Sequence, residues 1–91
     1  MEIQKDKMRQ EIRLDSRRHL EISGVSDVDS FDDVSVILNT VCGILNIDGK
    51  GIKVSVLDKE SGKVVLDGEI DAIYYNDDKN EKHGFFGRLL R

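Results

Sequence analysis

The stretch GILNIDGKGIKVSVLDKESGKVVLDGEIDAIYY, residues 43–75, decides the fold of this chain. Apolar and polar residues alternate along it and β-branched types dominate, which predicts strands rather than helices. Asp48–Gly51 and Lys59–Gly62 interrupt the alternation. An Asp-Gly pair between two alternating runs is a strong hairpin signal, because glycine accepts the positive φ angles of tight turns. We therefore expect antiparallel strands at 45–47, 52–56, 64–66 and 70–75, joined by turns at these interruptions.

The same period of two extends towards the N-terminus. Leu20 and Ile22 predict a first strand that Gly24 ends, and a second strand follows the acidic link 26–33, in which Phe31 is expected to plug the bottom of the sheet. The prediction is an all-β fold: a small antiparallel meander of about six strands that rolls up or packs on itself as a sandwich. The expected core residues are Ile22, Val36, Leu38, Leu45, Ile47, Val54, Val56, Ile70 and Ile73.

The 91 residues are expected to form one domain with polar extensions. Residues 1–17 are predicted to be a flexible or short helical tail, and 18–76 are the β-module. A polar linker at 77–83 leads to a short apolar C-terminal segment at 84–91.

Charge and composition narrow the function classes. Residues 21–79 carry five basic and thirteen acidic side chains, a net charge of −8, whereas each flanking segment is only weakly basic. An acidic body repels phosphate backbones, so no nucleic-acid partner is expected. The single cysteine, Cys42, excludes an internal disulfide and fits a reducing compartment. Neither a signal peptide nor a transmembrane stretch is recognisable, which predicts a cytoplasmic protein.

Several patterns that could carry chemistry fit structural roles better. The run 27–32 is rich in carboxylates but breaks the EF-hand calcium pattern, and the scattered glycines have turn or bulge spacing rather than that of a nucleotide loop. Cys42 has no predicted neighbour that would act as its base, whether His19 or His83. The acidic pairs at 58/60 and 67/69 are expected to form a solvent face. We therefore predict no catalytic residues, no cofactor and no metal.

The C-terminal segment 84–91 is the sharpest candidate for a binding site. Four large apolar residues and two arginines follow a charged linker, and an exposed apolar cluster lowers solubility unless something covers it. Three interpretations remain open: a docking segment for a partner protein, a tail folded back on its own sheet, and a weak membrane-surface anchor. The docking interpretation assigns partner contact to Phe85, Phe86, Arg88, Leu89, Leu90 and Arg91.

Four stretches together resemble the YabP/YqfC family of sporulation proteins: 20–33, 43–49, 68–75 and the tail 82–91, which looks like the YabP branch. Lys53 departs from the histidine expected in that strand, and the N-terminal tail is longer than usual. The resemblance implies a protein made in the mother cell of an endospore-forming bacterium and used in building the spore envelope. It further implies a partner, the multi-spanning sporulation membrane protein YabQ, and contact with the forespore membrane that is indirect or weak. It supplies no catalytic residues.

The leading hypothesis is therefore a non-catalytic sporulation protein that acts through protein–protein interaction. The alternative is a self-assembling structural β-protein, a homo-oligomer, because an open meander leaves edge strands free to pair. Lys50, Lys53 and Lys63, interpreted as edge charges, would disfavour such pairing. A small enzyme is the distant third hypothesis.

Overall fold

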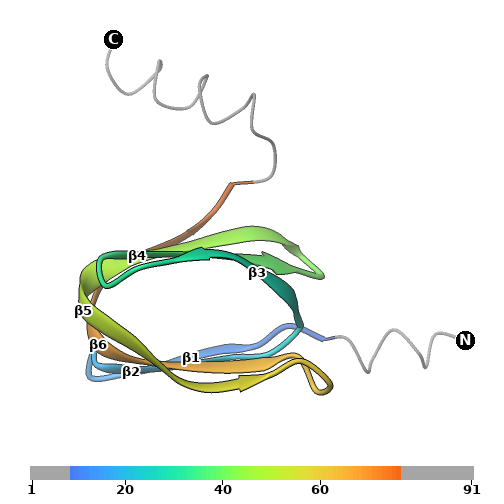
Figure 1. Cartoon of the computed structure of the whole chain (residues 1–91), viewed down its shortest axis with the longest axis horizontal. Helices are drawn as coiled ribbons and strands as arrows, with labels where there is room; N and C mark the ends of the chain where they lie inside the picture. Colours follow the sequence, from blue (N-terminus) through green and yellow to red (C-terminus); the bar gives the residue numbers. More distant parts are fainter. Residues whose placement is uncertain (1–8, 77–91) are drawn as a thin grey trace, which may run out of the picture.

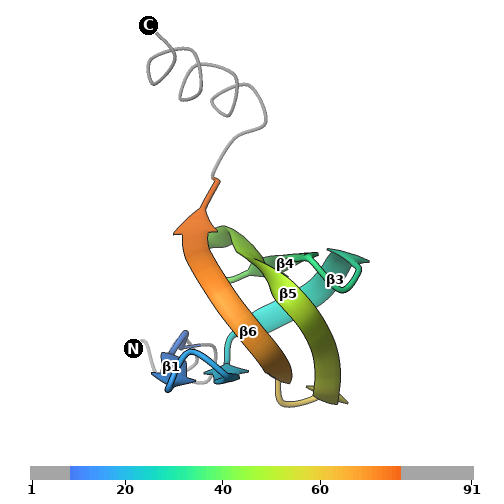
Figure 2. The same ribbon diagram turned by 90° about the vertical axis from the view of Figure 1, so that its left-hand side faces the viewer.

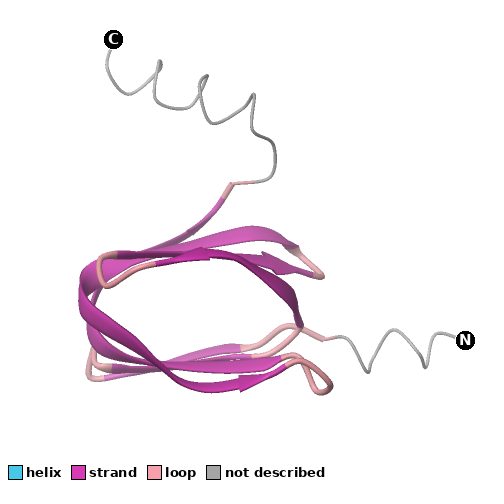
Figure 3. Ribbon diagram, viewed as in Figure 1, coloured by secondary structure: helices cyan, strands magenta, loops and turns pink. Residues whose placement is uncertain are grey.

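The computed structural model describes residues 9–76, which form one antiparallel sheet of six strands (Figure 1). The order of the strands across the sheet is β1-β2-β6-β5-β4-β3. Figure 3 shows only strands and loops in this part of the chain. The predicted all-β antiparallel class is confirmed. The strands are β1 (Ile12–Asp15), β2 (His19–Ile22), β3 (Val25–Phe31), β4 (Ser35–Thr40), β5 (Gly43–Asp58) and β6 (Lys63–Tyr75).

The sheet folds over on itself because its two longest strands, β5 and β6, are bent (Figures 1 and 2). The β1–β2 hairpin pairs with the first part of β6, residues 64–67. β4 pairs with the first part of β5, residues 43–48, and β3 pairs with β4. The two halves therefore lie face to face with the apolar side chains between them, which is the predicted roll.

The predicted hairpin at Asp48–Gly51 is wrong, because β5 continues through these residues without reversing. Its glycines bend the β5–β6 ribbon instead, where the pairing shifts register on both sides of Lys50. A Cβ at Gly49 would lie 2.0 Å from the carbonyl oxygen of Glu69, so only glycine permits this approach. Gly68 on β6 has a φ of 142° beside the same bend. Glycine's conformational freedom thus serves a bulge here and not a turn.

Two segments predicted to lie outside the sheet are strands. β1 lies within the predicted N-terminal tail, where pairing with β2 overrides the weak local signal. β3 occupies the predicted acidic link. Its pairing with β4 is irregular at two places, between Val25 and Asp27 and between Val28 and Ser30. These bulges break the period of two, so the alternation does not reveal the strand.

Most of the predicted core is confirmed. The fully buried side chains come from both halves of the roll, and Ile73 is partly buried against them. Val54 and Val56 were predicted wrongly, since they are 37% and 42% exposed. The pairing shifts between these two residues, so Val56 lies opposite Val65 on the outer face. Val54 lies opposite the buried Leu66 on the inner face and is nevertheless exposed near the end of β5. Phe31 is also exposed, at the end of the outermost strand, and plugs nothing. The buried apolar residues are Leu20, Ile22, Val25, Val36, Leu38, Leu45, Ile47, Ile52, Val64, Val65, Leu66 and Ile70.

Candidate functional site

A polar cluster on the outer face of the sheet joins β2 to β6. His19 Nδ1 lies 2.7 Å from Asp67 Oδ1, and His19 Nε2 lies 3.1 Å from Glu21 Oε2. The hydroxyl of Ser55 on β5 donates to the second oxygen of Asp67. Direct pairing of His19 with Asp67 in the β2–β6 register brings these groups together. The cluster therefore spans three neighbouring strands.

The two partners stabilise each other's charged forms. Hydrogen bonds to Asp67 and then to Glu21 raise the pKa of His19 above its ordinary value, since both ring nitrogens can donate only when the imidazole is protonated. The hydrogen bonds from Ser55 and then from His19 lower the pKa of Asp67. Because the His19 and Asp67 side chains are each 44% exposed, water screens the pair and its contribution to stability is modest.

This arrangement does not form a nucleophile with its base. In a hydroxyl-based catalytic site the imidazole accepts the proton of the hydroxyl, whereas Ser55 here donates to a carboxylate. Cys42 is exposed in the turn between β4 and β5, at the far end of β6, because Leu45 just after this turn pairs with Tyr75. His19 instead lies beside Asp67, in the first part of that strand. The structure thus separates Cys42 from His19.

Arg17 clamps the β1–β2 turn onto β6. Its Nε donates to the carbonyl oxygen of Ile70 at 3.0 Å, and its Nη2 contacts Asp71 Oδ1 at 2.9 Å. The backbone adds a bond from Ile70 N to Arg17 O at 2.9 Å. Ser16 and Arg17 adopt φ values of 54° and 58°, a left-handed conformation that side chains other than glycine enter at a cost. The clamp holds this strained turn in place.

A shallow hollow lies between β1 and the second half of β6. Gln10 bridges one end, because its Oε1 accepts hydrogen bonds from Thr40 and from the hydroxyl of Tyr75. Arg17 bridges the other end through its contacts with β6. We call this hollow the seam; it is lined by Leu14, Arg17, Ile70, Asp71, Ala72 and Ile73.

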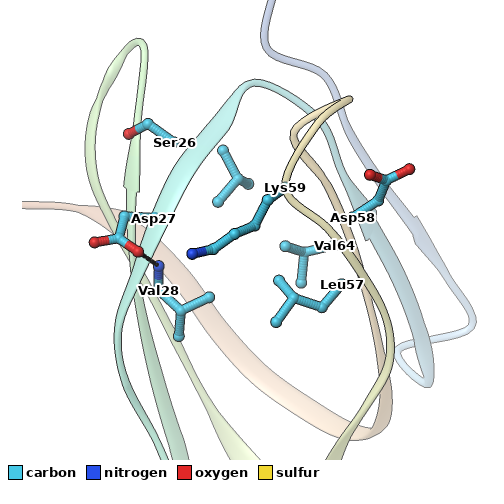
Figure 4. A pocket seen from close by; sticks show the side chains of 8 residues that line it. Ser26, Asp27, Val28, Leu57, Asp58, Lys59 and Val64 are labelled. Carbon is cyan, nitrogen blue, oxygen red and sulfur yellow. Dashed lines mark hydrogen bonds between the residues drawn. The ribbon is translucent and has the colours of Figure 1, made fainter.

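A second hollow lies between β3 and the β5–β6 turn (Figure 4). Figure 4 shows the Lys59 side chain reaching across it towards Val28, while Leu57 and Val64 line the opposite wall. Its volume is about 10 Å³, close to the minimum that one water molecule needs. This hollow is too small for a metabolite.

Other sequence candidates occupy structural positions. Asp58 caps the β5–β6 turn by accepting from the backbone N–H groups of Glu60 and Ser61, and Asp32 does the same for Val34 and Ser35. Glu69 lies 4.0 Å from Lys50 Nζ. Of the two acidic pairs predicted to form a solvent face, Asp58, Glu60 and Glu69 are exposed, whereas Asp67 is half-buried and bonded to His19 and Ser55.

The predicted contact residues Phe85, Phe86, Arg88, Leu89, Leu90 and Arg91 lie outside the described residues, as does His83. Sequence reasoning missed the His19–Asp67 cluster and the Arg17 clamp. Both join positions about fifty residues apart, so only a correct guess of the β2–β6 pairing could have found them.

Over residues 9–76 no group of three or more histidine, cysteine or acidic side chains is arranged to hold a metal ion. No helix in the described part of the chain has the length and apolar character needed to cross a bilayer.

The fold and the candidate site define a small all-β module whose polar clusters fasten its strands to one another. The model of the YabP family matches residues 6–82. The chain is also 36% identical over 83 residues to the spore protein YabP of Bacillus subtilis strain 168, an alignment that covers 89% of this chain and 83% of the relative. The chain belongs to the YabP family, and the resemblance noted in its sequence is confirmed.

Proposed function

We propose that this protein acts in sporulation, in building the spore envelope, by binding another protein. The observation that carries the proposal is its 36% identity, over nearly the whole chain, to a protein named for the spore. The polar clusters of residues 9–76 support it, because they join strands, and the Ser55 hydroxyl donates to a carboxylate rather than to an imidazole base. A scaffold that presents a binding segment fits these features better than an enzyme does.

The segment 84–91 is the proposed docking site. If it becomes helical on binding, its four large apolar residues fall at i, i+1, i+4 and i+5 and share one stripe, flanked by Arg88 and Arg91. Amphipathic helices dock into apolar grooves through such stripes, and aromatic residues commonly dominate the binding energy. The stripe consists of Phe85, Phe86, Leu89 and Leu90.

The proposed partner is the sporulation membrane protein YabQ, which the family resemblance suggests. In this proposal the protein stays in the cytoplasm of the mother cell and reaches the forespore membrane through YabQ. Its own affinity for lipid is expected to be weak, because two aromatic residues and a few positive charges give only marginal membrane binding.

The test is capture of YabQ by the full chain, by a truncation after Lys82 and by Phe86→Ala. Phe86→Ala is expected to weaken the complex by about 2 kcal/mol and to leave the melting temperature unchanged. Phe31→Ala is the matched control, since Phe31 is exposed on the folded module and its removal should not affect capture.

Three outcomes would contradict the docking role. Unchanged capture of YabQ by a stable truncated protein would show that residues 84–91 are not the contact. A melting temperature several degrees lower in the truncated protein, with capture proportional to the folded fraction, would instead indicate a tail packed on its own sheet. Binding of the full chain to anionic vesicles without YabQ would favour a membrane anchor.

A further inference from the structure

β1 and β3 are the two outermost strands of the described sheet, and β1 is the more regularly paired of the two. β3 has two irregularities in its pairing and exposes Asp27 and Asp29, devices that discourage the addition of a strand. β1 pairs with β2 without a register shift. The lysines interpreted from sequence as edge charges lie on β5 and β6, inside the sheet order, so they do not guard β1. Among residues 9–76 no strand pairs with the outer edge of β1, and its two charges, on Arg13 and Asp15, are opposite in sign, so an antiparallel copy can match them.

Two hydrogen bonds define which backbone groups of β1 face outwards. Ser23 N donates to Glu11 O at 2.9 Å, and Gly68 N donates to Arg18 O at 3.0 Å. Hydrogen-bonded and non-hydrogen-bonded pairs alternate along an antiparallel ladder. The pairs Ile12 with Ile22 and Leu14 with Leu20 are therefore the non-hydrogen-bonded ones. The N–H and C=O groups of Ile12 and Leu14 point to the free edge.

The side chains of the same two residues are apolar and incompletely covered. Ile12 is 37% exposed and Leu14 is 40% exposed, and both lie on the face of the sheet that buries Leu20 and Ile22. Leu14 also lines the seam. A strand added beside β1 would cover these side chains as well as satisfy the backbone groups.

We propose that β1 pairs with β1 of a second copy of this chain, antiparallel about a two-fold axis at Leu14. In this register Leu14 faces Leu14, and the outward N–H and C=O groups of the two leucines bond to each other. Arg13 then faces Asp15 of the second copy, twice by symmetry. Residues directly opposite in an antiparallel pair share a face, so these charges meet on the outer face.

The charges of the neighbouring strand agree with this register. Within one chain Arg13 is paired with Glu21, and Asp15 with His19. In the proposed dimer, four side chains therefore lie side by side across the strands on the outer face: Glu21 and Arg13 of one copy, then Asp15 and His19 of the second copy. Negative and positive groups alternate along the whole row, with His19 positive when protonated. In an alternative register with the two-fold axis at Arg13, the two Arg13 side chains would face each other and repel.

The contact is short, so the dimer is weak and depends on concentration. β1 has four residues, and stable interfaces bury about 800 Å² on each partner. A two-fold contact uses the same surface on both copies and stops at two. The β1 contact uses no residue of the proposed docking segment 84–91, so failure of either proposal leaves the other intact.

The test exchanges the two charges. Arg13→Asp places a carboxylate opposite Asp15 of the second copy, and Asp15→Arg places a guanidinium opposite Arg13, so each variant alone should remain monomeric. An equimolar mixture of the two should dimerise, because every facing pair is then opposite in charge. The double variant R13D/D15R should also dimerise. Both positions are exposed, so the variants should keep the wild-type circular dichroism spectrum. Arg13→Asp faces Glu21 and Asp15→Arg faces His19 within the same chain, so each should lower stability by no more than about 1 kcal/mol and stay folded.

Sedimentation velocity from about 10 µM to about 1 mM protein gives the readout, since a weak contact changes its occupancy over this range. Dimers of wild type, mixture and double variant with monomers of each single variant support the proposal. A wild type that stays monomeric, single variants that dimerise as the wild type does, or a mixture that stays monomeric would each overturn it. Growth beyond dimers would overturn it too, since it requires a second, different surface.

Discussion

His19 on β2 and Asp67 on β6 are joined by a 2.7 Å contact between Nδ1 and Oδ1, although 48 residues separate them in the chain. The contact fastens the β1–β2 hairpin to the central ribbon on the outer face, while Leu20 and Leu66, which also face each other, fasten it on the inner face. The position of β1, and therefore the proposed dimer edge, depends on both.

The first prediction concerns pH. The contacts raise the pKa of His19 above 6.5, so its contribution to stability is complete below about pH 6.5 and is lost as the pH rises through the folded-state pKa. Asp67, whose pKa is lowered, contributes stability above about pH 3.8, and this contribution is lost as the pH falls through the folded-state pKa of Asp67. His19→Gln should therefore lower the melting temperature more at about pH 5.5 than at about pH 8.5.

Asp67→Asn removes the carboxylate that holds the proton on His19. An NMR titration should therefore show a lower pKa for His19 in this variant than in the wild type. The comparison of variant with wild type isolates His19, because both proteins carry the other histidine, His83. A penalty for His19→Gln that is equal at both pH values would show that the pair contributes no charge-dependent stability.

The second prediction concerns the bend of β5 and β6. Gly49→Ala should cost about 3 kcal/mol or more, because the added Cβ would meet the carbonyl oxygen of Glu69 and the backbone must move. Gly51→Ala is the control: its Cβ would meet nothing within 4 Å, and only the φ of 59° opposes it, at a cost of about 1 kcal/mol. Urea denaturation measures both, and equal losses would contradict the packing argument.

The third prediction separates two neighbouring positions on β5. Ile52 is 2% exposed, so Ile52→Asp buries an unpaired carboxylate and should abolish cooperative unfolding. The sequence analysis placed Val54 in the core, which implies the same severe effect for Val54→Asp. Because Val54 is 37% exposed, we now expect that change to cost only about 1 kcal/mol. Thermal melts of both variants, followed by circular dichroism, measure the difference. Loss of the unfolding transition in V54D would show that Val54 belongs to the core after all.

The fourth prediction tests the strained turn. Ser16→Gly should raise stability by up to about 1 kcal/mol, because glycine adopts the φ of 54° without a steric cost. Arg17→Gly relieves similar strain but removes the bonds to Ile70 and Asp71, so it should lower stability. The difference in urea midpoint between these variants measures the clamp. If R17G is as stable as S16G, the clamp contributes nothing.

Sequence reasoning predicted the face of most strand residues, because alternation is a local property of the chain. Leu20, Ile22, Leu45 and Ile47 are buried as predicted. Sequence reasoning failed where a bulge changes the period, as at Val56, and where few apolar residues mark a strand, as in β1 and β3. The candidate contacts of the C-terminal segment stay a prediction.

The sequence by itself determined the class of the fold, since a period of two with β-branched residues has no stable helical alternative. Only the tertiary structure decided which strands pair. A glycine with positive φ serves a turn or a bulge equally well, and the choice at Asp48–Gly51 depends on whether β6 bends with β5 and so closes the core. The register of β2 with β6 brings His19 to Asp67, and the bend of β6 places Asp71 beside Arg17. The order of the strands leaves β1 at the edge of the described sheet.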